Sequence, residues 1–178
     1  SRANVTVFDR SMPRLEELDV QFSGAVDTVY ATQAAIDRAV MEADLVIGAV
    51  LVPGARAPKV ISRDAVSKMK PGSVSVDVAV DQGGCSETTK PTTHSDPVYV
   101  VDGVLHYCVT NMPGIVPYTS TLALTNTTLP YIVRLASEGV EQAIQSDPGL
   151  AKGVNVMNGT LACQAVAEAH GLRFTPLL

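Results

Sequence analysis

Two short apolar runs constrain the fold of this chain more than any other feature of its sequence. They span residues 45–54 and 74–84, are dominated by β-branched residues, and each ends in a turn of small residues. Such runs are typical of strands covered on both faces, as in a parallel sheet with helices on either side. Ligands of these sheets bind just beyond the carboxyl ends of the strands. We therefore expect the chemistry in the loops that follow the two runs.

The sequence around these runs alternates between strand and helix patterns. We expect strands over residues 4–9, 25–30, 45–50 and 73–78, and helices over residues 13–22, 33–42 and 63–69. An order of β-α-β-α-β-α-β with connections of this length is typical of right-handed crossovers. The predicted fold class is therefore α/β, with a doubly wound parallel sheet.

A different pattern follows the last of these strands. Segments 98–101 and 104–108 flank Asp102-Gly103, a hairpin turn signal. Residues 111–117 are expected to form a loop rich in Pro and Gly. A long helix is expected over residues 119–137, with a kink or a restart at Pro130.

The remaining sequence contains signals for short elements. Gly139 is expected to end the long helix, and Asp147-Pro148 to start a short one. Asn158-Gly159 is expected to turn a small hairpin, and residues 163–170 to form the last helix. The C-terminal part is thus mainly helical, and we place its boundary with the sheet near Pro117.

Composition and charge exclude several classes of function. The formal net charge of −5 argues against a nucleic-acid partner and gives no reason to expect an anionic membrane surface. The longest apolar segment is too short to cross a bilayer. Three widely spaced cysteines suit a reducing cytoplasm and form neither a disulfide framework nor a CxxC metal motif. We expect a cytoplasmic protein without a metal site.

Asp9 lies at the end of the first expected strand. An acid at this place resembles the one that binds the adenosine ribose at the second strand of a dinucleotide-binding unit. The glycine fingerprint of such a unit should lie about 20 residues earlier, which is before the first residue of this chain. Asp9 is thus either an ordinary strand-end acid or a sign that the polypeptide begins within a domain.

Several long motifs together resemble the alanine dehydrogenase family, and the resemblance covers essentially the whole chain. The motifs are residues 43–59, 69–74, 76–87, 111–117 and 122–131. The nucleotide-binding subunit of proton-pumping nicotinamide nucleotide transhydrogenase is similar too, but it resembles this chain less well in the Asp81-Gln-Gly-Gly and Asn111-Met-Pro segments.

The resemblance implies a reaction and a domain organisation. Family enzymes convert L-alanine, NAD and water to pyruvate, ammonium and NADH, and they usually assemble as hexamers. By this comparison, residues 1–117 are the latter part of a partial Rossmann-type NAD-binding domain whose Gly-rich turn lies upstream. Residues 118–178 are the helical segment that returns to an absent N-terminal substrate domain. Because that domain carries the substrate-binding Arg and Lys and the catalytic His, this fragment alone is expected to be inactive.

Asp81 is the predicted catalytic residue. It follows a buried strand and precedes glycines that let backbone approach a ligand closely. In the family the matching acid lies beside the nicotinamide and assists proton transfer, and a carboxylate there favours a developing iminium charge. The alternative is a turn-forming Asp. Asp77, still within the strand, is interpreted as a structural residue that binds a neighbouring loop.

The resemblance also implies the cofactor contacts, with NAD as the cofactor. Asp9 disfavours the extra phosphate of NADP, whereas Arg10 and Arg14 would accommodate it. The adenosine side is assigned Arg14 and the strand-end residues Val50 and Leu51. The nicotinamide side is assigned Val78, Ala79, Val80 and Asp81, together with the last strand's loop. The full predicted set is Asp9, Arg14, Val50, Leu51, Val78, Ala79, Val80, Asp81, Lys90, Val109, Thr110, Asn111 and Met112.

Val50 and Leu51 can pack in the core and line the pocket at once, and Met112 could instead fill a gap in the core. For Lys90, an ordinary solvated side chain is an equally good interpretation. Histidines 94, 106 and 170 are interpreted as structural or surface residues, and Cys85 as inert. Two alternative functions remain at this stage: a transhydrogenase subunit and a non-catalytic nucleotide-binding module. The long helix over residues 119–137 has more apolar residues than one core face needs, so we expect it to contribute to a homo-oligomer.

Overall fold

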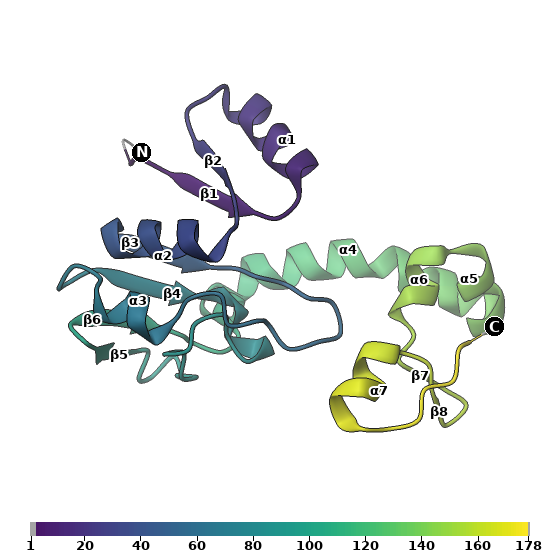
Figure 1. The fold of residues 1–178 in the computed structure, drawn as a ribbon. Coiled ribbons are helices and arrows are strands. Elements are labelled where there is room, and N and C mark those ends of the chain that lie inside the picture. Colours follow the sequence, from purple (N-terminus) through teal and green to yellow (C-terminus); the bar gives the residue numbers. More distant parts are fainter. Residues whose placement is uncertain (1–2, 178) are drawn as a thin grey trace. The chain divides into compact units, whose positions relative to one another are not determined.

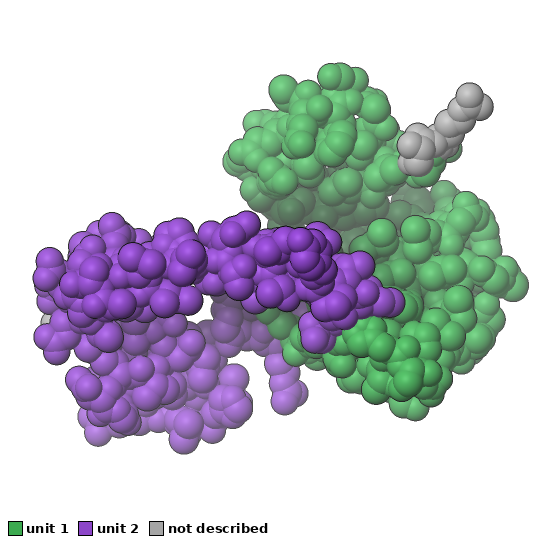
Figure 2. All heavy atoms as spheres, turned by 180° about the vertical axis from the view of Figure 1, so that it is seen from behind, with its two compact units in different colours: residues 1–50, 58–110 green, residues 51–57, 111–178 purple. Residues whose placement is uncertain are grey.

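The computed structural model describes residues 3–177. The chain divides into two compact units, which we describe separately (Figures 1 and 2). The first unit comprises residues 1–50 and 58–110, and the second comprises residues 51–57 and 111–178. The division between Thr110 and Asn111 lies a few residues before Pro117, where the sequence suggested a boundary.

The first unit contains two sheets. Strands β1 (Thr6–Asp9) and β2 (Asp27–Tyr30) form a parallel pair. The second sheet has the order β3-β4-β6-β5 and is built from β3 (Leu45–Gly48), β4 (Val74–Asp77), β6 (Val104–Tyr107) and β5 (Val98–Val101). Strands β3, β4 and β6 are parallel, and β5 pairs with β6 in the antiparallel direction. The α/β class with parallel strands is therefore confirmed.

Three helices connect the parallel strands of this unit. They are α1 (Met12–Phe22), α2 (Gln33–Glu42) and α3 (Arg63–Ser67). Each begins after a hydroxyl residue, Ser11, Thr32 or Ser62, whose side chain accepts a hydrogen bond from a backbone N–H of the first turn. These caps satisfy donors that the helix itself leaves unpaired, and the three helices lie close to the ranges expected from the sequence pattern.

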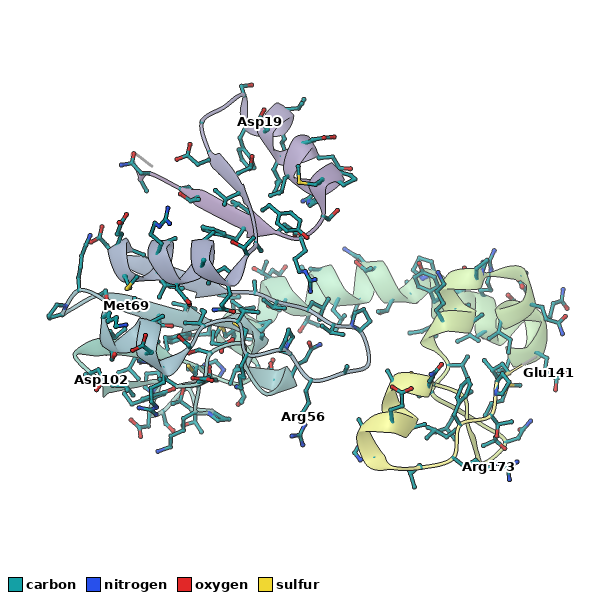
Figure 3. The ribbon with its side chains drawn as sticks, in the orientation of Figure 1. Asp19, Arg56, Met69, Asp102, Glu141 and Arg173 are labelled. Carbon is teal, nitrogen blue, oxygen red and sulfur yellow. The ribbon has the colours of Figure 1, made fainter. Side chains whose placement is uncertain are left out.

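The hairpin and the strand ends show how local chemistry fixes the boundaries. Asp102 (φ 50°) and Gly103 (φ 81°) turn the chain between β5 and β6, as predicted from the Asp-Gly pair (Figure 3). The strand expected over residues 73–78 ends at Asp77, because the Asp77 side chain caps a 3₁₀ helix, η1 (Val78–Gln82).

One sequence-based expectation about the first apolar run was wrong. The run was expected to be covered on both faces, but Leu45 and Ile47 are 55% and 61% exposed. The reason is that β3 is an edge strand of the four-stranded sheet, while β1 and β2 form a sheet of their own. Fully buried side chains of this unit lie instead on elements such as α3 and β6, and they include Val66, Val104 and His106.

The second unit is mainly helical. Its elements are η2 (Met112–Ile115), α4 (Pro117–Glu138), α5 (Val140–Ser146), α6 (Pro148–Gly153), β7 (Val156–Met157), β8 (Thr160–Leu161) and α7 (Gln164–His170). The β7–β8 hairpin turns at Asn158 and Gly159, as predicted, and Gly171 ends α7 in the left-handed conformation.

Three expectations for this unit need correction. The segment expected as a loop over residues 111–117 contains η2, and Pro117 already begins α4. Of the kink or restart expected at Pro130, the restart does not occur: Pro130 lies inside the continuous helix α4, because a proline removes only one hydrogen bond and the turns on both sides keep the segment helical. Helix α5 was not expected at all, since Gly139 ends one helix and begins the next.

Within residues 3–177, no helix combines the length and the apolar character that crossing a membrane requires.

Candidate functional site

The carboxyl ends of three parallel strands define the candidate site. Gly48 at the end of β3 is paired in register with Asp77 at the end of β4, and Val76 of β4 is paired with Tyr107 of β6. The segments after these residues therefore leave the sheet at the same edge, namely the one formed by the carboxyl ends of the parallel strands. This edge brings together several predicted site residues that are distant in sequence: Val50, Val78–Asp81, Val109 and Thr110.

A tight turn carries Asp81 at this edge. Helix η1 begins when Oδ1 of Asp77 accepts a hydrogen bond from the Ala79 N–H at 3.0 Å. It ends at Gly83 and Gly84, whose φ angles of 93° and 75° are easily adopted only by glycine. Their N–H groups donate to the carbonyls of Val80 and Ala79. The turn is closed by its own backbone, and it leaves Asp81 exposed.

Asp77 anchors the loop that follows η1, as the sequence indicated. It is 2% exposed, and its Oδ2 accepts hydrogen bonds from the N–H groups of Cys85 (2.8 Å) and Ser86 (3.3 Å). The Thr89 hydroxyl donates to the same oxygen. One buried carboxylate thus joins the beginning and the end of the loop, and its negative charge is stabilised by N–H and O–H dipoles.

Two glycines allow this packing. A Cβ at Gly48 would overlap the Cys85 sulfur, and a Cβ at Gly84 would lie 2.8 Å from Oδ2 of Asp77. Cys85 is fully buried, and burial together with the neighbouring Asp77 charge raises the pKa of its thiol to about 12. The thiol is therefore protonated at neutral pH, which excludes Cys85 as a thiolate nucleophile.

Sequence reasoning missed Lys59, which holds the same loop from another side. Its Nζ donates to the carbonyls of Gly83 (2.7 Å) and Ser86 (2.9 Å). Next to it, the Val60 N–H donates to the Cys85 carbonyl at 2.8 Å. The available signal was a single lysine at the end of a segment otherwise rich in Pro and small residues.

A buried polar network underlies the loop. The Thr88 hydroxyl lies 2.8 Å from Nε2 of His106 and 2.9 Å from the Ser86 hydroxyl. Tyr99 stacks on the His106 ring with a centroid separation of 5.0 Å, and its hydroxyl donates to the Thr88 carbonyl. Burial raises the pKa of the Tyr99 phenol. His106 is therefore a structural residue, as expected.

The predicted contacts at this edge differ in how they could reach a ligand. Val78 is 48% exposed, whereas Ala79, Val80 and Val109 are buried. The buried three can contribute backbone groups or packing, but not side-chain surface. Lys90 has an exposed side chain, and its backbone N–H donates to the Tyr99 hydroxyl at 2.7 Å.

Asp9 lies on β1, in the two-stranded sheet of the first unit, and Arg14 lies on helix α1, which follows this strand. The half-buried Asp9 ends β1, and its Oδ1 accepts a hydrogen bond from the Ser11 N–H at 2.8 Å. Arg14 on α1 is exposed and forms an ion pair with Glu17 at 2.9 Å. The acid is thus fixed by its own turn, while the positive charge of Arg14 already has a partner.

Three predicted residues fall in the second unit. Leu51 lies in an extended segment and is 68% exposed. Asn111 adopts a left-handed conformation (φ 53°) just before η2, and the half-buried Met112 begins that helix.

Across residues 3–177, His, Cys, Asp and Glu side chains form no cluster of three or more that could hold a metal ion.

Comparisons with known proteins identify relatives over nearly the whole chain. The family model described as "Alanine dehydrogenase/PNT, C-terminal domain" matches residues 2–164. An alanine dehydrogenase from Halomonas elongata is 61% identical over 172 residues, which cover 97% of this chain and 46% of the relative. One from Mycolicibacterium smegmatis is 51% identical and is covered to 47%. The chain thus spans about half the length of these curated relatives.

Solved structures of related proteins also match nearly the whole chain. A structure of L-alanine dehydrogenase matches with a TM-score of 0.80 and 51% identity, covering 95% of this chain and 46% of that chain. A transhydrogenase structure from Sinorhizobium meliloti matches with a TM-score of 0.62 at 24% identity, which shows a shared fold only. The partial Rossmann-type fold predicted from sequence is confirmed by the first of these.

Proposed function

Because this chain belongs to the alanine dehydrogenase/PNT C-terminal domain family, we propose that it is the cofactor-binding half of an NAD-dependent L-alanine dehydrogenase. The whole protein would oxidise L-alanine with water to pyruvate and ammonium, passing a hydride to NAD, and would run the reverse reaction as well. The observation that carries this proposal is the 61% identity to an alanine dehydrogenase over 97% of the chain. The 24% identity to the transhydrogenase structure favours that alternative far less.

Asp9 supports NAD over NADP as the cofactor. Its carboxylate can accept hydrogen bonds from the adenosine ribose hydroxyls, and its charge repels a 2′-phosphate. Arg14 would accommodate such a phosphate, but its guanidinium already lies 2.9 Å from Glu17. We assign Arg14 a weaker contact on the adenosine side, together with Val50 and Leu51.

We assign the nicotinamide end of the cofactor to the residues that follow the carboxyl end of β4. Val78 offers a half-exposed apolar side chain, and the exposed carboxylate of Asp81 lies on the same helical turn. An apolar surface beside a charged group is the combination that a flat ring with a reacting carbon requires. The remaining proposed contacts on this side are Ala79, Val80, Lys90, Val109, Thr110, Asn111 and Met112.

Asp81 is the proposed catalytic residue of this half. The bound nicotinamide would supply the hydride acceptor. The Asp81 carboxylate would stabilise the positive charge that develops as alanine becomes an iminium, and it would assist the proton transfers of imine hydrolysis. Its position on a backbone-closed turn supports this role, because a fixed charge needs little reorganisation during the reaction.

The rest of the whole protein would supply the substrate-binding domain and the other catalytic groups. This follows the family pattern, and the 46–47% coverage of the relatives is consistent with it. We therefore propose that residues 118–178 return to that domain, that the fragment alone is inactive, and that the enzyme is a cytoplasmic homo-oligomer.

The function is tested with the purified full-length protein that contains this chain. NADH formation is followed by absorbance with L-alanine and NAD, and parallel reactions replace NAD by NADP or L-alanine by another amino acid. We expect turnover only with NAD and fastest turnover with L-alanine. Absence of alanine-dependent NADH formation would overturn the proposal. Hydride exchange between two nucleotides without any amino acid would instead support the transhydrogenase alternative.

A further inference from the structure

The loop that carries Asp81 is held from two independent sides. We propose that Asp77 and Lys59 are positioning residues that fix the segment from Val78 to Thr89, and through it the Asp81 carboxylate, for the reaction. This assignment rests on the proposed alanine dehydrogenase function. In this role Asp77 and Lys59 act through the Asp81 carboxylate.

The first anchor is the buried carboxylate of Asp77. Its donors come from both ends of the segment: Ala79 at the start, and Cys85, Ser86 and Thr89 at the end. Among the described ion pairs none involves Asp77. Its charge is therefore balanced by the loop itself, and the loop geometry depends directly on this carboxylate.

The second anchor is Lys59, which lies outside the segment. Its ammonium group donates to the Gly83 carbonyl at 2.7 Å, directly after η1, and to the Ser86 carbonyl at 2.9 Å. These two carbonyls hold the ammonium group of Lys59 at the end of the turn that contains Asp81. Lys59 thus adds a restraint at Gly83, which Asp77 does not contact, and a second one at Ser86, which both anchors hold.

The two anchors leave Asp81 as an exposed residue on a fixed turn. A small displacement of a catalytic group costs much of its effect, since productive geometry tolerates only a fraction of an ångström. Loss of either anchor is therefore expected to reduce the rate of the chemical step more than the binding of the nucleotide.

The test uses Lys59→Met, Lys59→Arg and Thr89→Val variants of the full-length protein. Lys59→Met removes one anchor without creating a buried charge, and Lys59→Arg restores a cation with several donors. Thr89→Val removes one bond to Asp77 and preserves the side-chain shape. Lys68→Met is the matched control, because Lys68 is an exposed lysine whose ammonium group pairs with Asp64.

We expect Lys59→Met to lower kcat about ten-fold or more, with the KM for NAD changed by less than about two-fold. Lys59→Arg should recover most of the loss, Thr89→Val should show a smaller decrease in kcat, and Lys68→Met should match the unaltered protein. Thermal unfolding is measured in parallel. A variant that unfolds earlier but keeps its kcat per folded molecule would show a structural role only, and would overturn the assignment.

Different results overturn the proposed function and the positioning role of Lys59. If the unaltered protein oxidises no alanine, the proposed function fails and this assignment fails with it. If the unaltered protein is active and Lys59→Met keeps the kcat of Lys68→Met, only the positioning role is overturned.

Discussion

The two compact units of this chain differ in how they bury their side chains. The first unit buries apolar residues such as Val66, Val104 and Val109 together with polar ones such as Asp77 and His106. In the second unit, the described apolar residues that are buried are alanines: Ala57, Ala143 and Ala167. The 22-residue helix α4 contains no buried residue.

The second unit leaves larger apolar side chains exposed. Tyr118 and Leu124 on α4 are 79% and 64% exposed, and a groove of about 470 Å³ is lined by residues of α4 to α6 and β7 that include Leu135 and Ile144. A helix that exposes several large apolar side chains, as α4 does, often takes part in an interaction site. The first unit therefore fixes the geometry of its candidate site by internal hydrogen bonds, whereas the second unit exposes apolar side chains that could contact another surface. Three substitutions and one thiol modification test this contrast.

The largest effect is expected at Asp81 in the first unit. Asp81→Asn in the full-length protein should reduce kcat by about a hundred-fold or more, because the side chain then carries no charge and no transferable proton at the reacting centre. Steady-state kinetics and thermal unfolding are measured together, and unfolding should be unchanged. Glu141→Gln, an exposed acid of the second unit, is the control. Near-normal turnover of Asp81→Asn would remove Asp81 from the proposed role.

Asp77→Asn is expected to have the next largest effect, this time on stability. The amide presents one acceptor oxygen where the carboxylate presents two, so donors of the loop lose their partners. The free energy of unfolding should fall by about 3 kcal/mol, measured by urea denaturation. Asp147→Asn is the matched variant in the second unit, where the acid also caps a short helix but is only half-buried. An equal loss in both variants would contradict the contrast between the units.

Leu129→Arg probes the exposed face of α4. Leu129 is 56% exposed, and in a homo-oligomer that uses this helix a buried guanidinium would weaken self-association about ten-fold or more. Light scattering over a concentration series measures this. Val20→Arg places the same charge at a 78% exposed position of α1 and should leave the oligomer intact. If Leu129→Arg leaves the size of the oligomer unchanged, α4 does not form the contact.

The smallest effect concerns the thiols. The pKa of Cys85 is raised to about 12 in the folded state, whereas an unfolded thiol titrates near 8.5. The unfolded state therefore loses its proton first, and the contribution of this thiol to stability is lost as the pH rises from about 8.5 towards 12. At neutral pH a thiol reagent should modify the half-exposed Cys163 and spare Cys85. Rapid modification of Cys85 in the folded protein would show that the first unit opens.

Much of the first unit could be predicted from the sequence because its signals are local. The alternation of strand and helix patterns predicted α1, α2 and α3, and Asp102-Gly103 predicted the hairpin turn. The structural role of Asp77 was inferred in the same way, from an acid inside an apolar strand. The family resemblance added the expected role of Asp81, which stays a prediction.

Other features could not be predicted because they depend on contacts between distant residues. Lys59 meets the loop 24 residues away, at Gly83, and the exposure of Leu45 depends on which strand lies beside β3. Helix α5 was missed because Gly139, which signals a helix end, also begins the next helix.

The sequence alone determined the order of the strands and of most helices, their class and the expected place of the candidate site, because periodicity and turn residues act over a few neighbouring positions. The tertiary structure alone decided that one buried carboxylate and one lysine hold the loop carrying Asp81. Hydrogen bonds between segments far apart in the chain exist only once the sheet has brought those segments together.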